Sequence, residues 1–154
     1  KPGVTATVFD LPNVLPLTAE YVRRAGLEGR VVLVAGDYDT DGLGGGFDLV
    51  LLSAIIHSNS PQGNRDLFRK AAAALNPSGQ LVVQDFIVAE ERTGPPFGVL
   101  FALNMLVGTE AGDTYTGSEV REWMEQAGLV RIAARDMPFG TTIVVARRPS
   151  DAPS

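Results

Sequence analysis

The chain has 154 residues, of which 45% are hydrophobic and 20% are charged, a balance typical of one globular domain of ordinary size. Its 13 basic and 18 acidic residues give a net charge of -5, so no excess of cations is available for a nucleic-acid backbone or an anionic membrane surface. The absence of cysteine excludes disulfides and thiolate chemistry, and no apolar run reaches the roughly 18 residues that span a bilayer. We therefore expect a cytoplasmic protein that binds neither nucleic acid nor membranes.

Strand-like and helix-like segments alternate along the chain. Apolar runs and periodicity predict strands at residues 4–9, 30–35, 47–57 and 80–88, and helices at residues 18–25, 64–75, 95–107 and 118–127. Thr18 and Ser118 are the expected N-caps of two of these helices. The last two strands, at residues 130–137 and 141–146, are separated only by a short turn, so they form an antiparallel hairpin. These elements predict a mainly parallel α/β sheet that ends in such a hairpin, with one domain over residues 1–148 and a disordered tail at residues 149–154.

The segment around which the others are arranged is FDLVLLSAIIH, residues 47–57. Continuous apolar runs of this kind are typical of strands that are buried on both faces in the middle of a parallel sheet. Ligands of such sheets bind beyond the carboxyl ends of the strands, which is where Ser53 and His57 would lie. His57 is the only histidine, and a structural or merely exposed histidine is the alternative interpretation.

The loop before this strand is acidic and rich in glycine. Asp37, Asp39, Asp41 and Gly42, with Asp48 further on, match the oxygen ligands and the glycine of a calcium-binding loop. The loop is flanked by strands rather than by helices, and three consecutive glycines replace its stiffer second half. We therefore expect no metal here, and calcium remains the alternative.

Several motifs, in this order and spacing, resemble one family. They are FDLP, VAGDY, FDLVLLSAIIH, ALNPSGQLVVQDF and GDTYTGSEVREWMEQAGL, followed by the closing hairpin. The chain is similar over most of its length to the S-adenosylmethionine-dependent O-methyltransferases related to plant phenolic and bacterial tailoring enzymes. The resemblance implies a Rossmann-like class I methyltransferase sheet and a role in secondary metabolism.

One part of the family pattern is absent from these residues. The glycine-rich first motif, on the family's first strand, would precede Lys1, and that strand lies between the strands near Thr5 and Phe47. Its removal would leave unpaired backbone groups on both neighbouring strands. We expect the first strand to be supplied by another segment of a longer enzyme, which the resemblance also implies is a homodimer through an N-terminal domain.

The resemblance assigns five residues to the cofactor S-adenosyl-L-methionine. They are Asp10, Leu11, Asp37, Tyr38 and Ser53. A carboxylate at the end of a strand can accept hydrogen bonds from both ribose hydroxyls, which suits Asp10, although an acid before Leu-Pro also caps turns. Asp37 and Tyr38 fall on the adenine side, with a solvated loop acid as the alternative. Ser53 stands where plant relatives have a basic contact.

The resemblance also assigns the catalytic groups and the substrate class. His57 matches the general base, and Asp85 is placed to orient its imidazole, since neighbouring strand ends lie about 5 Å apart. The substrate is then a small hydroxylated, phenolic or polyketide-like molecule, lined by Phe97, Phe101 and Met105 on the apolar helix. Ser58, Asn59 and Ser60 replace the acid and tryptophan that follow the family histidine, which leaves a catalytically inactive cofactor-binding or scaffold domain as the alternative. Asp113 is the nearest candidate for a second family acid.

Overall fold

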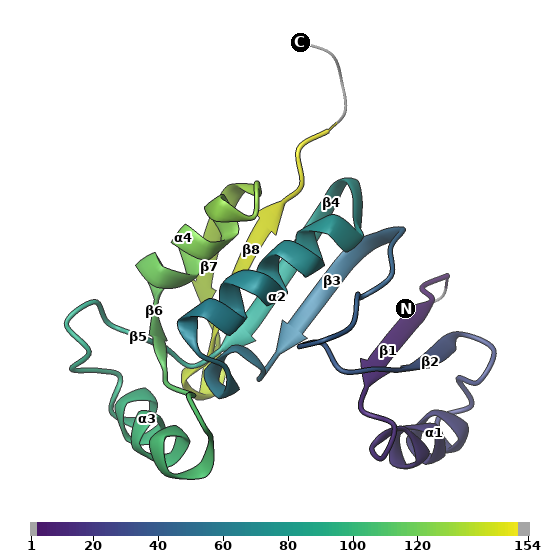
Figure 1. Cartoon of the computed structure of the whole chain (residues 1–154), viewed down its shortest axis with the longest axis horizontal. Coiled ribbons are helices and arrows are strands. Elements are labelled where there is room, and N and C mark those ends of the chain that lie inside the picture. The colour runs from purple at the N-terminus through teal and green to yellow at the C-terminus, as the bar shows by residue number, and fades with distance from the viewer. Residues whose placement is uncertain (1–2, 151–154) are drawn as a thin grey trace. The chain divides into compact units, whose positions relative to one another are not determined.

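The computed structural model describes residues 3–150 and separates the chain into two compact units. The first unit is Lys1–Leu43 and the second is Gly44–Ser154, and each is described by itself (Figure 1). Of the tail predicted at residues 149–154, the last four residues lie outside the described part. A single domain over residues 1–148 stays a prediction.

The first unit is a strand, a helix and a second strand. β1 (Ala6–Asp10) and β2 (Val31–Ala35) pair in parallel, from Ala6 opposite Val31 to Asp10 opposite Ala35, and α1 (Leu15–Arg24) crosses between them. Their β-branched residues favour extended backbone. The expected cap at Thr18 is wrong: α1 already begins after Val14, because Pro16 suits the first turn of a helix and Thr18 falls inside it.

The second unit contains a four-stranded sheet in the order β3-β4-β8-β7. β3 (Phe47–Ser53) pairs in parallel with β4 (Leu75–Asp85), and β4 pairs on its other side with β8 (Thr142–Arg147), which is antiparallel. β7 (Val130–Asp136) completes the hairpin with β8 around the turn η2 (Pro138–Gly140). The predicted closing antiparallel hairpin is confirmed, and β3 with β4 forms the parallel part of this mixed sheet.

β3 differs from its prediction in both position and extent. It is an edge strand of its sheet rather than a central one, and it ends at Ser53, four residues before His57. Leu49 is 52% exposed and Leu51 is 56% exposed, whereas only Leu52 is buried. The expectation of burial on both faces is wrong for the face that carries Leu49 and Leu51, whereas the unpaired second edge of β3 agrees with the expectation that the family's first strand is not among these residues.

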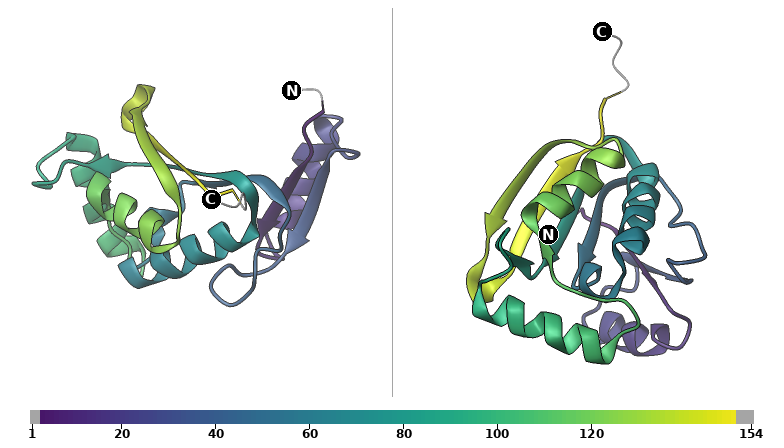
Figure 2. Two further views of the ribbon diagram at one scale, coloured as in Figure 1. Left: turned by 90° about the horizontal axis from the view of Figure 1, so that it is seen from above. Right: turned by 60° about the vertical axis from the view of Figure 1, so that its left-hand side comes forward.

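Two helices cover one face of this sheet (Figures 1 and 2). α2 (Pro61–Ala74) begins at the N-cap Ser60, whose hydroxyl accepts a hydrogen bond from the Gly63 amide. α4 (Gly117–Gln126) is capped by Thr116 in a capping box with Glu119, so the cap predicted at Ser118 is wrong by two residues. The core between the helices and the sheet is built from large side chains that are almost completely buried: Phe68, Leu81, Val83, Val120, Trp123 and Met124.

The apolar segment predicted as a helix is α3 (Pro96–Gly108). It lies between two short strands, β5 (Ile87–Val88) and β6 (Tyr115–Thr116), which pair in parallel. Figure 1 shows α3 beyond the end of the sheet at which β3 and β4 finish. Within residues 3–150 no helix has the length and apolar character needed to cross a membrane.

Candidate active site

His57 lies on a short turn just after β3. The strand ends at Ser53, and Ala54 takes the left-handed conformation with φ 55°. This conformation is uncommon for a residue with a side chain, and it turns the chain out of the sheet. The 3-10 turn η1 (Ile56–Ser58) follows and places His57 beside the end of β4.

His57 and Asp85, two of the predicted site residues, lie within hydrogen-bonding distance of each other. His57 Nδ1 lies 2.8 Å from Asp85 Oδ1 and 3.0 Å from Oδ2. Asp85, the last residue of β4, is 2% exposed, and its Oδ1 also accepts a hydrogen bond from the Phe86 amide at 2.8 Å. An ionised carboxylate only accepts hydrogen bonds, so beside it a neutral imidazole carries its ring proton on Nδ1 and its lone pair on Nε2. Nε2 has no hydrogen-bond partner within residues 3–150.

Aromatic rings surround this pair. The Phe101 ring stands nearly perpendicular to the His57 imidazole, with centroids 4.9 Å apart and an interplanar angle of 88°. Phe86 contacts both Phe97 and Phe101, at centroid distances of 4.9 Å and 4.8 Å. Because Phe97, Phe101 and Met105 are spaced four residues apart, they follow one side of α3. Met105 is buried, whereas Phe97 is 58% exposed.

Phe86 was missed by the sequence reasoning. It follows Asp85 directly, at the position where β4 stops, and the same rule that selected Asp85 as a strand end could have selected it. Its ring joins the two phenylalanines of α3 to the end of the sheet. The aromatic wall is defined here as Phe86, Phe97 and Phe101.

The four cofactor residues predicted in the first unit lie at the ends of its two strands. The parallel register places Asp10 opposite Ala35, and the Gly36 amide donates a 3.0 Å hydrogen bond to the Asp10 carbonyl. Asp10 Oδ1 accepts from the Leu11 amide at 2.8 Å, and Asp37 Oδ1 accepts from the Asp39 amide at 2.9 Å. Asp37 and Tyr38 therefore follow the strand adjacent to Asp10.

Gly36 lies close to the Phe9 ring between these strand ends. A Cβ added to Gly36 would lie 2.4 Å from Cζ of Phe9 and 2.6 Å from its Cε2. Real Cβ atoms do not approach so closely, so a larger residue would displace the ring next to Asp10. Gly36 thus permits the loop after β2 to lie against β1.

Ser53 ends β3 in the second unit. Its side chain is hydrogen-bonded to Gln84, a residue that was not predicted for the site. Its hydroxyl donates to Gln84 Oε1 at 3.0 Å, and Gln84 Nε2 lies 3.5 Å from Thr141 Oγ1. Gln84 stands opposite Ser53 in the parallel pairing of β3 with β4. Ser53 and Gln84, which are both uncharged, therefore stand where plant relatives are expected to have a basic contact.

In the acidic loop of the first unit, the carboxylates of Asp37 and Asp41 accept hydrogen bonds from backbone amides of the same loop. Asp41 Oδ2 accepts a 2.9 Å hydrogen bond from the Asp37 amide, and the Asp41 amide donates to the Asp37 carbonyl at 2.7 Å. Across the described residues, no group of three or more His, Cys, Asp or Glu side chains is arranged to hold a metal ion. The loop therefore forms a turn closed by its own hydrogen bonds.

The carboxylate of Asp113, the candidate second acid, contacts groups other than His57. Its carboxylate pairs with Arg92 at 3.2 Å and accepts from the Thr114 amide at 2.7 Å. Arg92 also pairs with Glu119 at 2.8 Å. The contact of Asp113 with the His57 turn is made by its backbone amide, which donates to the His57 carbonyl at 3.0 Å.

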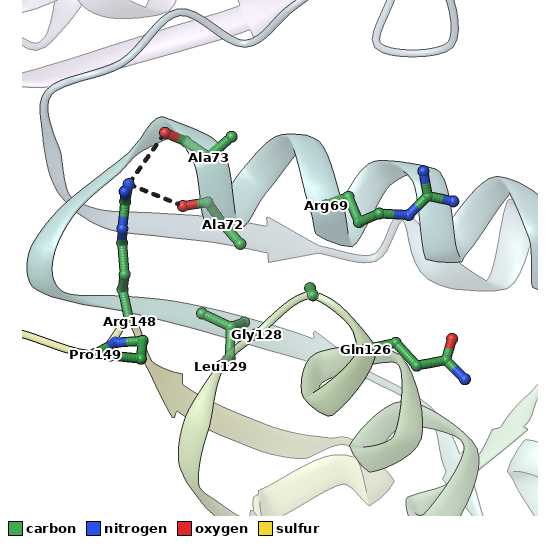
Figure 3. A pocket seen from close by; sticks show the side chains of 9 residues that line it. Arg69, Ala72, Ala73, Gln126, Gly128, Leu129, Arg148 and Pro149 are labelled. Atoms are coloured by element: carbon green, nitrogen blue, oxygen red, sulfur yellow. Dashed lines mark hydrogen bonds between the residues drawn. The ribbon is translucent and has the colours of Figure 1, made fainter.

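A shallow hollow of about 450 Å³ lies at the opposite end of α2 from η1, between α2 and the segment that follows α4 (Figure 3). Arg148 extends along its wall and donates to the Ala73 carbonyl at 3.3 Å and to the Ala72 carbonyl at 3.4 Å. These contacts add to the hydrogen bonds of carbonyl groups in the last turn of α2, where the Ala72 carbonyl also accepts from the Leu75 amide. Neither His57 nor Asp85 lines the hollow, which lies beside the C-terminal end of α2.

A family model described as an O-methyltransferase domain matches residues 1–130. A 3-hydroxy-5-methyl-1-naphthoate 3-O-methyltransferase from Streptomyces sahachiroi is 38% identical over 127 residues, which are 82% of this chain and 36% of that protein.

Two solved structures share the fold. Human N-acetylserotonin methyltransferase, in complex with S-adenosyl-L-methionine, is 27% identical with a TM-score of 0.84, covering 97% of this chain and 42% of that one. An O-methyltransferase family 2 protein from Planctomyces limnophilus, in complex with apigenin, is 27% identical with a TM-score of 0.87, covering 94% and 42%. The expected Rossmann-like class I methyltransferase fold is confirmed. The chain spans less than half the length of these relatives.

Proposed function

The chain belongs to the O-methyltransferase family, and on this premise we propose that the protein transfers a methyl group from S-adenosyl-L-methionine to a hydroxyl of a small aromatic molecule. The observation that carries the proposal is the buried hydrogen bond between His57 and Asp85 beside the aromatic wall. It provides a base with one ring nitrogen held and the other available. These are the requirements for deprotonating a bound hydroxyl.

His57 is proposed as the general base. Its Nε2 lone pair takes the proton of the substrate hydroxyl, while Asp85, hydrogen-bonded to Nδ1, stabilises the positive charge that develops on the imidazole. The deprotonated oxygen then forms a bond to the methyl carbon as the bond from that carbon to sulfur breaks, and its electron pair stays on sulfur. A general base of this kind contributes about 10²–10⁴-fold to the rate.

The first unit supplies the residues proposed to hold the nucleoside part of the cofactor. S-adenosyl-L-methionine, when bound, supplies an electrophilic methyl group on a sulfonium sulfur. Asp10 fits the ribose because one of its oxygens is occupied by the Leu11 amide and a carboxylate has further acceptor capacity for hydroxyl groups. Asp37 and Tyr38, after the neighbouring strand, are proposed for the adenine side. Ser53 remains a proposed cofactor contact in the second unit.

The aromatic wall and Met105 support a flat, apolar substrate that carries a hydroxyl. Phe101 contacts the imidazole itself, so a ring bound against the wall presents its substituents near His57. The relative from Streptomyces sahachiroi is named for a hydroxynaphthoate, and the Planctomyces limnophilus structure contains apigenin, which carries hydroxyls on aromatic rings. We therefore place the substrate among hydroxylated aromatic or polyketide-derived molecules.

Calorimetry with S-adenosyl-L-methionine, followed by a methyl-transfer assay on hydroxynaphthoates and simple phenols, tests the proposal in the native-length protein. Wild type should bind the cofactor and turn over, whereas His57→Ala should bind it equally and lose about 10²–10⁴-fold in kcat. Arg121→Ala, on the exposed side of α4, is the matched control and should behave as wild type. Tight cofactor binding without turnover in any variant would identify an inactive scaffold instead.

A homodimer through an N-terminal domain is also proposed. Apolar side chains on the outer side of α3 offer a surface for such contacts: Leu100 is 66% exposed and Leu106 is 73% exposed. Sedimentation of the native-length protein at micromolar concentration should give the mass of a dimer. A single species with the mass of a monomer would reject it.

A further inference from the structure

The turn that carries His57, together with its C-cap residue, is held at three backbone carbonyls by donors from outside the turn. The Ile56 carbonyl accepts a 2.9 Å hydrogen bond from Asn64 Nδ2, and the His57 carbonyl accepts one from the Asp113 amide at 3.0 Å. The Asn59 carbonyl accepts from the Tyr115 hydroxyl. A three-residue 3-10 turn provides few hydrogen bonds of its own, so these external donors fix its position.

Asn64 faces this turn from the first part of α2. It is fully buried, and its neighbours on the inner side of the helix, Leu67 and Phe68, are apolar. A buried amide is costly unless its hydrogen bonds are satisfied, and here both ends are used. Nδ2 donates to the Ile56 carbonyl, while Oδ1 accepts from Asn59 Nδ2 at 3.1 Å. One contact is therefore made to the His57 turn itself and the other to Asn59, the residue that caps its end.

Gly112 lies close against the backbone of the turn. A Cβ at this position would lie 2.3 Å from the His57 carbonyl oxygen and 2.5 Å from Thr109 Oγ1, so only glycine allows this approach. The Gly112 amide donates to Thr109 Oγ1 at 2.8 Å, and Thr109 in turn donates to the Met105 carbonyl at 2.7 Å. The segment that lies on His57 is therefore tied to the end of α3.

We propose that Asn64 and Gly112 are positioning residues that hold the His57 imidazole in line with Asp85 and at a fixed distance from the aromatic wall. The proposal rests on His57 being the base of the proposed reaction. Because Gly112 is linked through Thr109 to α3, the base and the helix that carries Phe101 are held together. A displacement of about 1 Å at a reacting group can cost roughly 10²-fold in rate, so loss of either fastening lowers kcat.

Asn64→Ala in the native-length protein is the first test. We expect kcat to fall roughly tenfold, with the affinity for S-adenosyl-L-methionine unchanged, because the variant leaves the first unit intact. Val120→Ala is the control, since Val120 is equally buried but hydrogen-bonds nothing in the turn. Its kcat should stay within about twofold of wild type even where its stability falls.

The ring nitrogens of His57 give a readout that does not depend on turnover. Nitrogen-15 signals that vanish in His57→Ala belong to His57, and in wild type they should report a proton on Nδ1. In Asn64→Ala and Gly112→Ala these signals should move toward a mixture of the two neutral forms, whereas in Val120→Ala they should not move. Tyr115→Phe, which loses one hydroxyl and keeps its buried ring, should show a smaller change in the same direction and covers the case in which Asn64→Ala does not fold.

Unchanged ring signals and unchanged kcat in Asn64→Ala and Gly112→Ala would overturn the positioning role. If instead His57→Ala keeps the wild-type rate, the proposed reaction fails. In that case the nitrogen-15 signals of His57 alone show whether Asn64 and Gly112 orient its imidazole.

Discussion

In the second unit, His57 and Asp85 stand on a four-stranded sheet backed by the buried side chains of Phe68 and Trp123, whereas in the first unit Asp10 and Asp37 follow only two strands and one helix. None of the buried hydrophobic side chains of the described residues lies between residues 3 and 43. Two-stranded sheets are marginally stable by themselves. The proposed catalytic pair is therefore preorganised by its own core, while the two strands and one helix that carry the proposed nucleoside residues have no such buried side chains among the described residues.

The largest expected effect concerns the core of the second unit. Trp123 packs against Phe68 at a centroid distance of 5.9 Å and against Tyr115 at 4.8 Å, so Trp123→Ala should lower the free energy of unfolding by about 3–5 kcal/mol. Val32→Ala in β2, where the side chain is 59% exposed, should cost only about 0.5 kcal/mol. Urea unfolding followed by circular dichroism measures both. Equal losses would mean that the two units do not differ as described.

The next prediction separates the two units by kinetics. Asp85→Asn should lower kcat by about 100-fold, because an amide cannot stabilise the charged imidazole as a carboxylate does, and should leave cofactor binding unchanged. Asp10→Asn should instead raise the KM for S-adenosyl-L-methionine by roughly tenfold with a smaller change in kcat. Steady-state kinetics of both variants tests the division of roles. A KM effect in Asp85→Asn would contradict it.

Tyr115 should make the second unit sensitive to alkali. Burial raises the pKa of Tyr115 to about 12, and the carboxylates of Asp113 and Glu119 add to the rise. The neutral phenol is therefore favoured in the folded state, and its contribution to stability is complete below about pH 10, the usual pKa of tyrosine. It is lost progressively as the pH rises toward 12.

Urea midpoints at several pH values test this contribution. At neutral pH, Tyr115→Phe should cost about 1–1.5 kcal/mol, because the hydrogen bond to the Asn59 carbonyl is removed. Between pH 10 and 12 the wild type should lose stability faster than the variant. Parallel pH profiles for the two proteins would show that Tyr115 does not titrate in this way.

The smallest expected difference compares two threonines on helices of the two units. Thr116 is the N-cap of α4 and its hydroxyl accepts from the Glu119 amide, so Thr116→Ala should cost about 1 kcal/mol. Thr18 lies inside α1, where alanine is the better helix former, so Thr18→Ala should change stability by at most about 0.5 kcal/mol. Thermal unfolding of both variants measures the difference. A larger loss for Thr18→Ala would contradict the observed helix start.

The order of strands and helices and the closing hairpin could be predicted because periodicity and turn residues act locally. The end of β3 could not, because the apolar run continues through Ile55 and Ile56 while the backbone turns at Ala54. Apolar residues suit a buried 3-10 turn as well as a strand, and only the conformation of Ala54 distinguishes the two. The unpaired edge of β3 agrees with the expected absence of the family's first strand, which would lie beside it.

Within the candidate site, residues at strand ends could be identified from the sequence, whereas those that support them could not. Asp85 was assigned by the family resemblance and by its place at the end of a predicted strand, while Asn64 occurs in an ordinary helical segment. Its partners on the turn are five to eight residues away, and nothing in the local pattern marks a buried amide. Gly112 could not be identified from the sequence either. Glycine is required there by the nearby His57 carbonyl and not by the backbone conformation of residue 112 itself.

The outermost strand of the second unit's sheet, β7, is irregular. Its pairing with β8 shifts between Val130 and Ala133, and Arg131 has φ 55°, as expected for a β-bulge. Arg135 and Asp136 add charges along the same strand. Bulges and charges on a border strand prevent further strands from adding to it, which protects against open-ended aggregation. Two copies of the protein that associate would therefore be expected to use another surface, and the sheet would not grow from this side.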